Sequence, residues 1–208
     1  SVPLRGGISL SLDRMTKIVD LDEKNMVVTA EAGVRTFDLY NCCAAKDLFY
    51  PPDPASWKFS TIGGNVAENA GGMRAVKYGV TSDYVMGLEI VMADGTVLRT
   101  GGKAIKNVTG YDLKSLFAGS EGTLGIITTV LLKLIAMPKR RGTLQIMFRT
   151  LADGCTMIHK MLQSGIVPSA AEIMDKVCLE AVARQRKMDF APAGEACLVI
   201  EIDGDQDN

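Results

Sequence analysis

Glycine is the residue type whose spacing in this sequence first suggests chemistry. The chain has 21 glycines among 208 residues, above the average usage of about 7%, and they gather in clusters. Segment 60–65 combines two hydroxyls, the pair Gly63 and Gly64, and the amide of Asn65, just before an expected short helix. Because glycine lacks a Cβ, its backbone can approach an anion closely, and free N–H groups at a helix start favour negative charge. This segment therefore predicts a site where main-chain amides hold a pyrophosphate.

A second glycine-rich loop covers residues 119–125, directly before a strand rich in β-branched residues that we expect at 126–135. Neither loop matches the GxxxxGK[ST] of a P-loop or the GxGxxG that follows the first strand of a Rossmann fold. One such loop alone is more often a plain turn. Two of them, with the stiff segment around Pro51, Pro52 and Pro54, favour nucleotide binding.

Composition narrows the remaining function classes. Lys and Arg total 23 against 24 Asp and Glu, a net charge of −1, which gives no basic surface for nucleic acid. No apolar run reaches the ~18 residues that a membrane span needs. With His159 as the only histidine, we expect no metal site and no Ser-His-Asp hydrolase. The cysteines are odd in number and lack a CxxC pair, which is typical of reduced thiols in a cytoplasm-like compartment; they are Cys42, Cys43, Cys155, Cys178 and Cys197.

The elements that must position these loops follow from hydrophobic periodicity and turn residues. Thr36 is an expected early cap of a first helix, and Asp112 can cap a helix that runs through Ala118. Residues 93–96 form a hairpin turn between two strands. In this part of the chain, the expected strands lie at 8–12, 17–22, 26–32, 85–92 and 97–99. The expected helices lie at 34–46 and, after segment 60–65, in a short stretch that runs through Asn69 to residues 71–72.

The best domain boundary is the segment 137–142, which combines Pro, Gly and three consecutive charges. Beyond it the pattern becomes strand, helix, strand, helix, strand, at 143–149, 152–163, 171–174, 176–186 and 197–203. We therefore expect two domains, at residues 1–138 and 139–208. His159 lies within the first helix of the second domain, where a packing or surface role is far more common than catalysis.

Five blocks of sequence in fixed order identify a family resemblance. They are PPDPAS at 51–56, STIGGNVAENAGG at 60–72, KYG at 77–79, GYDL at 110–113 and GSEGTLGIIT at 119–128. The chain resembles the FAD-linked D-2-hydroxy acid dehydrogenases, the glycolate oxidase and D-lactate dehydrogenase branch of the vanillyl-alcohol oxidase / para-cresol methylhydroxylase flavoprotein superfamily. The resemblance is strong over residues 1 to about 135 and moderate beyond.

The resemblance implies a fold, a cofactor and a reaction. The fold class would be α+β: an incomplete FAD-binding domain of the para-cresol methylhydroxylase type, followed by the start of an α/β, ferredoxin-like cap domain. The reaction would be hydride transfer from the α-carbon of a 2-hydroxy acid to FAD, giving a 2-keto acid. Residues lining FAD would be Pro52, Asp53, Pro54, Ala55, Ser56, Thr61, Gly63, Gly64, Asn65, Asn69, Gly71, Tyr78, Glu121, Gly125, Ile126 and Ile127.

Within that set, the resemblance implies that Gly63, Gly64 and Asn65 donate to the pyrophosphate and ribityl region, and that the stretch from Glu121 to Ile127 approaches the adenosine half. Catalytic residues stay unknown, because the family's substrate-binding arginine lies in later blocks. The family has a further glycine-rich loop just before the segment that matches Ser1, so we expect an internal fragment that binds FAD weakly, is inactive alone and self-associates.

The expected partners are a small 2-hydroxy acid and an electron acceptor, either a protein or a quinone. The expected location is the cytoplasm, with membrane association through partner subunits as the alternative. Two rival functions stay open. One is a non-catalytic subunit or scaffold that keeps the fold and binds protein partners, and the other is an oxidase that uses O₂ on the same flavin domain.

Overall fold

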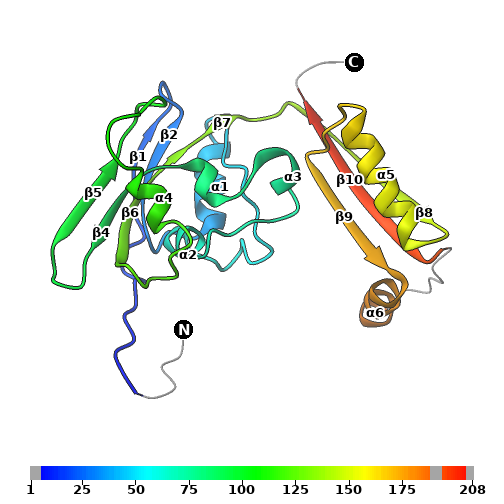
Figure 1. Cartoon of the computed structure of the whole chain (residues 1–208), viewed down its shortest axis with the longest axis horizontal. Helices are drawn as coiled ribbons and strands as arrows, with labels where there is room; N and C mark the ends of the chain where they lie inside the picture. Colours follow the sequence, from blue (N-terminus) through cyan, green and yellow to red (C-terminus); the bar gives the residue numbers. More distant parts are fainter. Residues whose placement is uncertain (1–5, 188–193, 205–208) are drawn as a thin grey trace. The chain divides into compact units, whose positions relative to one another are not determined.

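The computed structural model describes residues 6–187 and 194–204, which form an α+β structure as expected (Figure 1). The chain divides into two compact units, one made of Ser1–Gly72 with Val80–Met137 and the other of Met73–Gly79 with Pro138–Asn208. Each unit is described by itself below. Segment 73–79 thus belongs to the second unit although its sequence neighbours belong to the first. The predicted domain limits, 1–138 and 139–208, stay a prediction.

The first unit is built on a five-stranded sheet whose neighbouring strands are all antiparallel. Its order is β1-β2-β6-β4-β5, and a two-stranded pair, β3 with β7, stands beside it. Strand β6 lies at the centre, where valine, leucine and isoleucine side chains on its buried face suit a covered sheet. The bounds are β1 Ile18–Asp22, β2 Val27–Glu31, β3 Leu48–Phe49, β4 Val85–Val91, β5 Val97–Gly101, β6 Ile126–Lys133 and β7 Ile135–Ala136.

Short helices cover this sheet, and two are fixed by side-chain caps. Helix α2 packs on β2 and β6; it begins where the Thr61 hydroxyl accepts from the Gly64 N–H and ends at Asn69, which has a left-handed φ of 49°. The predicted Asp112 cap is confirmed, since its side chain accepts from the Ser115 N–H. The bounds are α1 Thr36–Ala44, α2 Ile62–Glu68, the 3-10 helix η1 Thr81–Tyr84, and α4 Leu113–Phe117.

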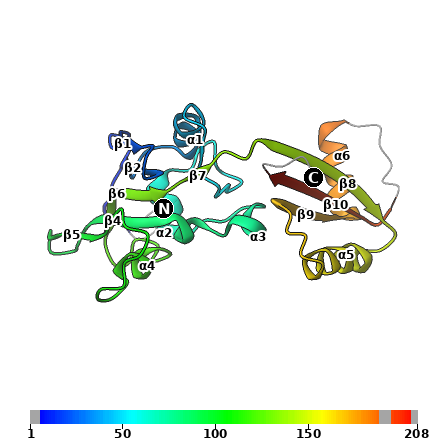
Figure 2. The same cartoon turned by 90° about the horizontal axis from the view of Figure 1, so that it is seen from above.

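The second unit has a three-stranded antiparallel sheet of order β8-β10-β9, so β10 lies between two strands that run parallel to each other. Helix α5 packs along one face, where Met161, Leu198 and Ile200 form the core (Figure 2). Asp175 caps α6 by accepting from the Cys178 N–H at 2.8 Å. The bounds are α3 Ala75–Tyr78, β8 Arg140–Phe148, α5 Leu151–Gln163, β9 Ala170–Asp175, α6 Lys176–Arg186 and β10 Ala196–Gly204.

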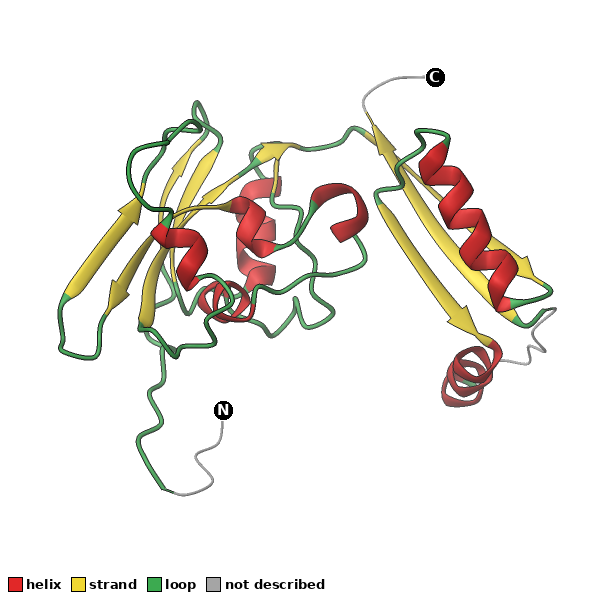
Figure 3. Ribbon diagram, viewed as in Figure 1, coloured by secondary structure: helices red, strands yellow, loops and turns green. Residues whose placement is uncertain are grey.

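Several local expectations were wrong (Figure 3). Residues 8–12 form no strand, and Ile8 is 94% exposed, because no neighbouring strand in the described chain pairs with them. Thr36 does not cap α1; it is the first helical residue, and its hydroxyl lies 2.9 Å from that of Ser60. Helix α3 and η1 were not predicted. Among the described residues, no helix combines the length and the apolar character that crossing a bilayer requires.

Candidate functional site

A cleft of about 530 Å³ runs beside α2 in the first unit. Helix α2 forms one side, the loop before β6 forms another, and the segment before β1 forms a third. Seven of the predicted cofactor residues line it: Thr61, Gly63, Gly64, Glu121, Gly125, Ile126 and Ile127. The other lining residues were not predicted from sequence; they are Leu10, Ser11, Leu12, Asp13, Gly33, Ala67, Glu68 and Gly122. We call this space the glycine cleft.

The cleft glycines serve two different purposes. A Cβ at Gly63 would lie 2.5 Å from the Cβ of Ala32, and one at Gly125 would lie 2.6 Å from Ile90. These two glycines are therefore needed for close packing of the chain on itself. In contrast, a Cβ at Gly64 would meet only the Thr61 hydroxyl, at 3.1 Å, and one at Gly122 would meet nothing within 4 Å. At those two positions bare backbone borders open space, as a cofactor cradle requires.

The main-chain amides of residues 63–65 all donate within the protein, and their predicted role in holding a pyrophosphate stays a prediction. The Gly63 N–H donates to Ala32 O at 2.8 Å, and the Asn65 N–H donates to Thr61 O at 2.9 Å. The Gly64 N–H donates to the Thr61 hydroxyl at 3.3 Å. Asn65 is also buried, and its side-chain amide donates to the Thr36 hydroxyl at 2.8 Å. Sequence alone could not reveal that the Gly63 N–H is already bonded to the carbonyl of Ala32, which follows β2 and lies 31 residues earlier in the chain.

The electrostatics of the glycine cleft suit hydroxyl donors rather than phosphate. Asp13, Glu68 and Glu121 bring three carboxylates to the lining, and none of its described residues is Lys, Arg or His. Carboxylates repel a diphosphate but accept hydrogen bonds from the hydroxyls of a ribose, as the acidic residue of dinucleotide-binding folds does. Glu121 is held in the left-handed region, φ 52°, while its own N–H donates to Ala67 O at 2.9 Å.

The predicted flavin-lining segment 52–56 does not border the glycine cleft. It belongs to a loop anchored by aromatic rings: the Tyr40 hydroxyl donates to Pro52 O, and Trp57 lies 5.8 Å from the Tyr40 ring and 5.7 Å from the Phe37 ring, between centroids. The backbone of the same loop passes very close to Gly72, where a Cβ would lie 2.0 Å from the carbonyl oxygen of Asp53. Only glycine fits this close approach.

The remaining predicted residues are also away from the cleft lining. The Asn69 side chain accepts from the Ser82 N–H at 2.8 Å, and a Cβ on Gly71 would lie 3.0 Å from Val80. Tyr78 lies in the second unit, where its hydroxyl donates to Asp203 at 2.8 Å. The structure thus brings the residues predicted to approach the adenosine half together with Thr61, Gly63 and Gly64 in one cleft. The other predicted contacts do not line that cleft.

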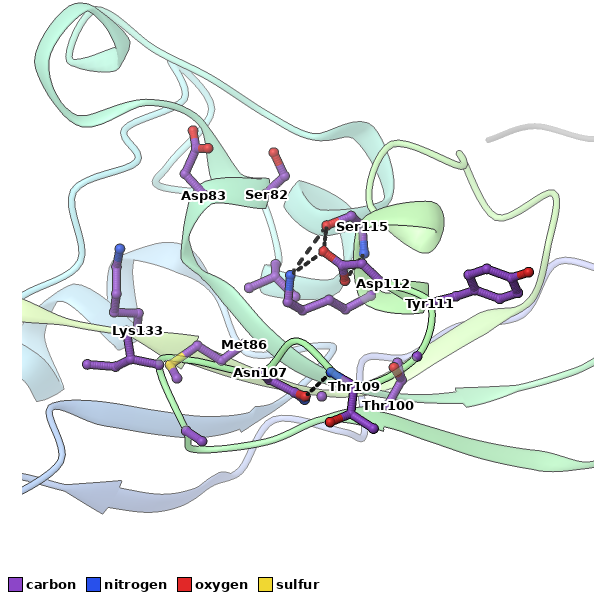
Figure 4. Close-up of a pocket in the computed structure, with 16 residues that line it drawn as sticks. Ser82, Asp83, Met86, Thr100, Asn107, Thr109, Tyr111, Asp112, Ser115 and Lys133 are labelled. Carbon is purple, nitrogen blue, oxygen red and sulfur yellow. Dashed lines mark hydrogen bonds and ion pairs between the residues drawn. The ribbon is translucent and has the colours of Figure 1, made fainter.

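A second cavity, of about 390 Å³, lies between β4, α4 and the loop 101–112, and none of its lining residues is among the predicted cofactor residues (Figure 4). Its lysines are engaged: Lys114 Nζ lies 2.9 Å from an Asp112 carboxylate oxygen, and Lys133 Nζ lies 5.1 Å from the centroid of the Tyr84 ring. Burial of that ring raises the pKa of Tyr84 to about 12. Because its lysines already contact protein groups and it contains none of the predicted cofactor residues, this cavity is a weaker candidate than the glycine cleft.

Comparison with known proteins points to one family. Residues 1–101 match the FAD binding domain family, and residues 137–208 match the C-terminal domain of FAD linked oxidases. The chain is 44% identical over 202 residues to glycolate oxidase subunit GlcD of Bacillus subtilis (strain 168), covering 97% of this chain and 43% of that protein. It is 44% identical over 176 residues to a D-lactate dehydrogenase of Anaerostipes hadrus, covering 85% of this chain and 37% of that protein.

A solved structure has a similar fold. An alkyldihydroxyacetonephosphate synthase superposes with a TM-score of 0.76 at 25% identity, over 93% of this chain and 38% of that one. The chain therefore spans about two fifths of the length of the relatives it matches.

Proposed function

Because the chain belongs to the FAD-linked oxidase family, whose cofactor is FAD, we propose that the protein containing it oxidises a small 2-hydroxy acid, of the glycolate or D-lactate type, to a 2-keto acid. FAD supplies the acceptor for the hydride that leaves the α-carbon. The residues of this chain bind and orient that cofactor. Two relatives named for glycolate and D-lactate chemistry support the choice of substrate class.

The observation that carries the cofactor assignment is the glycine cleft. Its three carboxylates suit the two hydroxyls of an adenosine ribose, and the open backbone at Gly64 and Gly122 leaves room for a flat base and sugar. We therefore assign the cleft to the adenosine half of FAD, held by Glu68, Glu121 and the backbone from Gly125 to Ile127. The residues fit this half of the cofactor and do not fit its diphosphate.

The other predicted contacts remain proposals on the strength of the family resemblance. Residues 52–56 would line the flavin, with Asn69, Gly71 and Tyr78 nearby. Because the amides of residues 63–65 are consumed within the protein, the diphosphate needs donors from elsewhere. We therefore propose that this 208-residue chain alone binds FAD weakly and is inactive.

The partners and location are proposed in the same way. One relative is named as a subunit of glycolate oxidase, so we propose that electrons pass from the reduced flavin to a partner protein or a quinone in a multi-subunit cytoplasmic enzyme. A non-catalytic scaffold is the rival function, and the occupied amides of α2 are the observation in its favour.

Absorbance and turnover of the protein expressed from its complete open reading frame test this proposal. The proposal expects a yellow protein whose flavin band bleaches with D-lactate or glycolate and recovers with a dye acceptor, but not with O₂ alone. Recovery with O₂ would favour an oxidase. A colourless protein that cannot be reconstituted with FAD would contradict the proposal and favour the scaffold.

A further inference from the structure

The second unit holds one short segment by charge rather than by apolar burial. Segment 73–79 contains α3, none of whose residues is buried, and Met73 beside it is 53% exposed. Helix α3 packs near β9. Because little apolar area is removed from water here, the hydrophobic contribution to holding the segment is small. Its attachment must come from polar contacts.

Those contacts converge on one buried carboxylate. The Asp203 side chain is 0% exposed, and Lys77 Nζ lies 2.5 Å from its Oδ1. The Tyr78 hydroxyl donates to its Oδ2 at 2.8 Å, and Lys77 Nζ also donates to the Asp203 carbonyl at 3.2 Å. Two adjacent residues thus bind both oxygens of one carboxylate. A buried carboxylate without such partners is strongly unfavourable, so Asp203 needs this segment as much as the segment needs Asp203.

A second acidic residue on the same strand face reinforces the arrangement. Residues two apart on a strand share a face, so Glu201 points to the same side of β10 as Asp203. Glu201 Oε1 lies 3.7 Å from Arg74 Nε, at the start of the segment, and 3.5 Å from Arg141 Nε on β8. The α5 core occupies the opposite face, through Leu198 and Ile200. One face of β10 therefore serves packing and the other serves this charged attachment.

These contacts also fix the orientation of the Tyr78 ring. Its hydroxyl is committed to Asp203, and Lys77 Nζ lies 5.2 Å from its centroid. We propose that Asp203 is a positioning residue for the flavin site: it holds segment 73–79 and the Tyr78 ring in the conformation that cofactor binding uses. This inference rests on the proposed function, which counts Tyr78 among the FAD-binding residues.

Amide hydrogen exchange in the 208-residue chain without cofactor tests the first half of the proposal. The N–H groups of Lys77, Tyr78 and Gly79 donate to carbonyls within the segment at 3.0–3.2 Å. Asp203→Asn keeps the size of the side chain and removes its charge. Because a hydrogen bond to a charged group is worth several-fold to about a hundred-fold in an equilibrium, we expect these amides to exchange at least about tenfold faster relative to those of β8. Glu180→Gln, at an exposed position of α6, is the matched control and leaves them unchanged.

The visible circular dichroism of FAD bound to the full-length protein tests the second half. Asp203→Asn and Tyr78→Phe should change the flavin bands in the same direction, while Glu180→Gln should not. Unchanged exchange in Asp203→Asn would overturn the proposal, and so would faster exchange with unchanged flavin bands. If Asp203→Asn fails to fold, Tyr78→Phe alone decides both readouts, because it leaves the Lys77 pair intact. A wild-type protein without flavin would refute the proposed function, and the exchange rates would still decide whether Asp203 holds Tyr78.

Discussion

Two neighbouring stretches of this sequence, 60–69 and 73–79, lie close together along the chain but are held in opposite ways. In the first, α2 lies against β2 through backbone hydrogen bonds and through the absence of a side chain at Gly63, whose Cβ would lie 2.5 Å from that of Ala32. In the second, α3 buries none of its residues, and the contacts of Lys77 and Tyr78 with Asp203 hold it to β10.

The two stretches are therefore sensitive to different substitutions. Residues 60–69 are sensitive to added side-chain volume, and residues 73–79 are sensitive to loss of charge. The α2 stretch tolerates no added atom at Gly63 but depends little on charge. The α3 stretch has room for other side chains but depends on pairing one carboxylate that is 0% exposed. Glycine at position 63 therefore allows α2 to pack closely beside the cleft. The charged contacts with Asp203 determine where segment 73–79 attaches.

The largest effect is expected from Gly63→Ala. The new methyl group would overlap Ala32, and overpacking of this kind costs about 3 kcal/mol of unfolding free energy. Urea unfolding of the 208-residue chain measures it. Gly64→Ala is the matched control: its Cβ meets only the Thr61 hydroxyl, at 3.1 Å, so stability should stay within about 1 kcal/mol of wild type. Ala32→Gly should recover part of the loss in the double variant, and no recovery would contradict the packing explanation.

The next largest effect is expected from Lys77→Met. Removing the ammonium leaves the buried Asp203 carboxylate with fewer partners, which costs about 2 kcal/mol after allowance for a lysine side chain that is 30% exposed. The β10 amide resonances during urea unfolding report the stability of the second unit. Lys160→Met on α5 is the control, expected within about 0.5 kcal/mol of wild type. Equal losses of unfolding free energy in Lys77→Met and Lys160→Met would contradict the explanation that the pairing with Asp203 holds α3.

The smallest effect concerns a more exposed charge in the first unit. Hydrogen bonds from Thr128 and then Arg99 hold the pKa of Glu89 below its ordinary 4.5. Because the folded value is the lower one, this contribution is complete above about pH 4.5 and is lost as the pH falls through the folded pKa. The Arg99 side chain is 77% exposed, so the contribution should stay below about 1 kcal/mol.

Stability measured from pH 6 to pH 3 in wild type and Glu89→Gln checks this expectation. The variant should lose part of the acid-dependent decline. A decline identical to that of wild type would show that the hydrogen bonds of Glu89 contribute nothing measurable to the pH dependence of stability.

Sequence predicted the parts of the fold whose signals are local. The extent of α5, the hairpin before β5 and the cap at Asp112 all depend on neighbouring residues, and each was found as expected. Helix α3 has four residues and no buried face, so its existence depends on partners about 125 residues away. Apolar and polar residues do alternate at 8–12, but these residues form no strand because a strand also needs a neighbouring strand with which to pair.

The same limit applies to the site. The sequence marks where side chains are absent, and residues of both glycine loops line the cleft. Sequence could not show which N–H groups remain available, since that depends on tertiary partners such as Ala32 O. Nor could it show that three carboxylates gather in the cleft, because Asp13, Glu68 and Glu121 come from three separate segments.

Whether the glycine cleft receives the adenosine half of FAD is decided by the FAD affinity of the full-length Gly64→Leu variant. Gly64 is exposed and a side chain there extends into open space, so folding should be preserved while the cleft is filled. Equilibrium titration monitored by flavin fluorescence should show at least about a hundred-fold weaker binding than wild type, a loss of about 2.7 kcal/mol, with the melting temperature of the cofactor-free protein unchanged. Wild-type affinity in this variant would contradict the assignment and place the cofactor elsewhere.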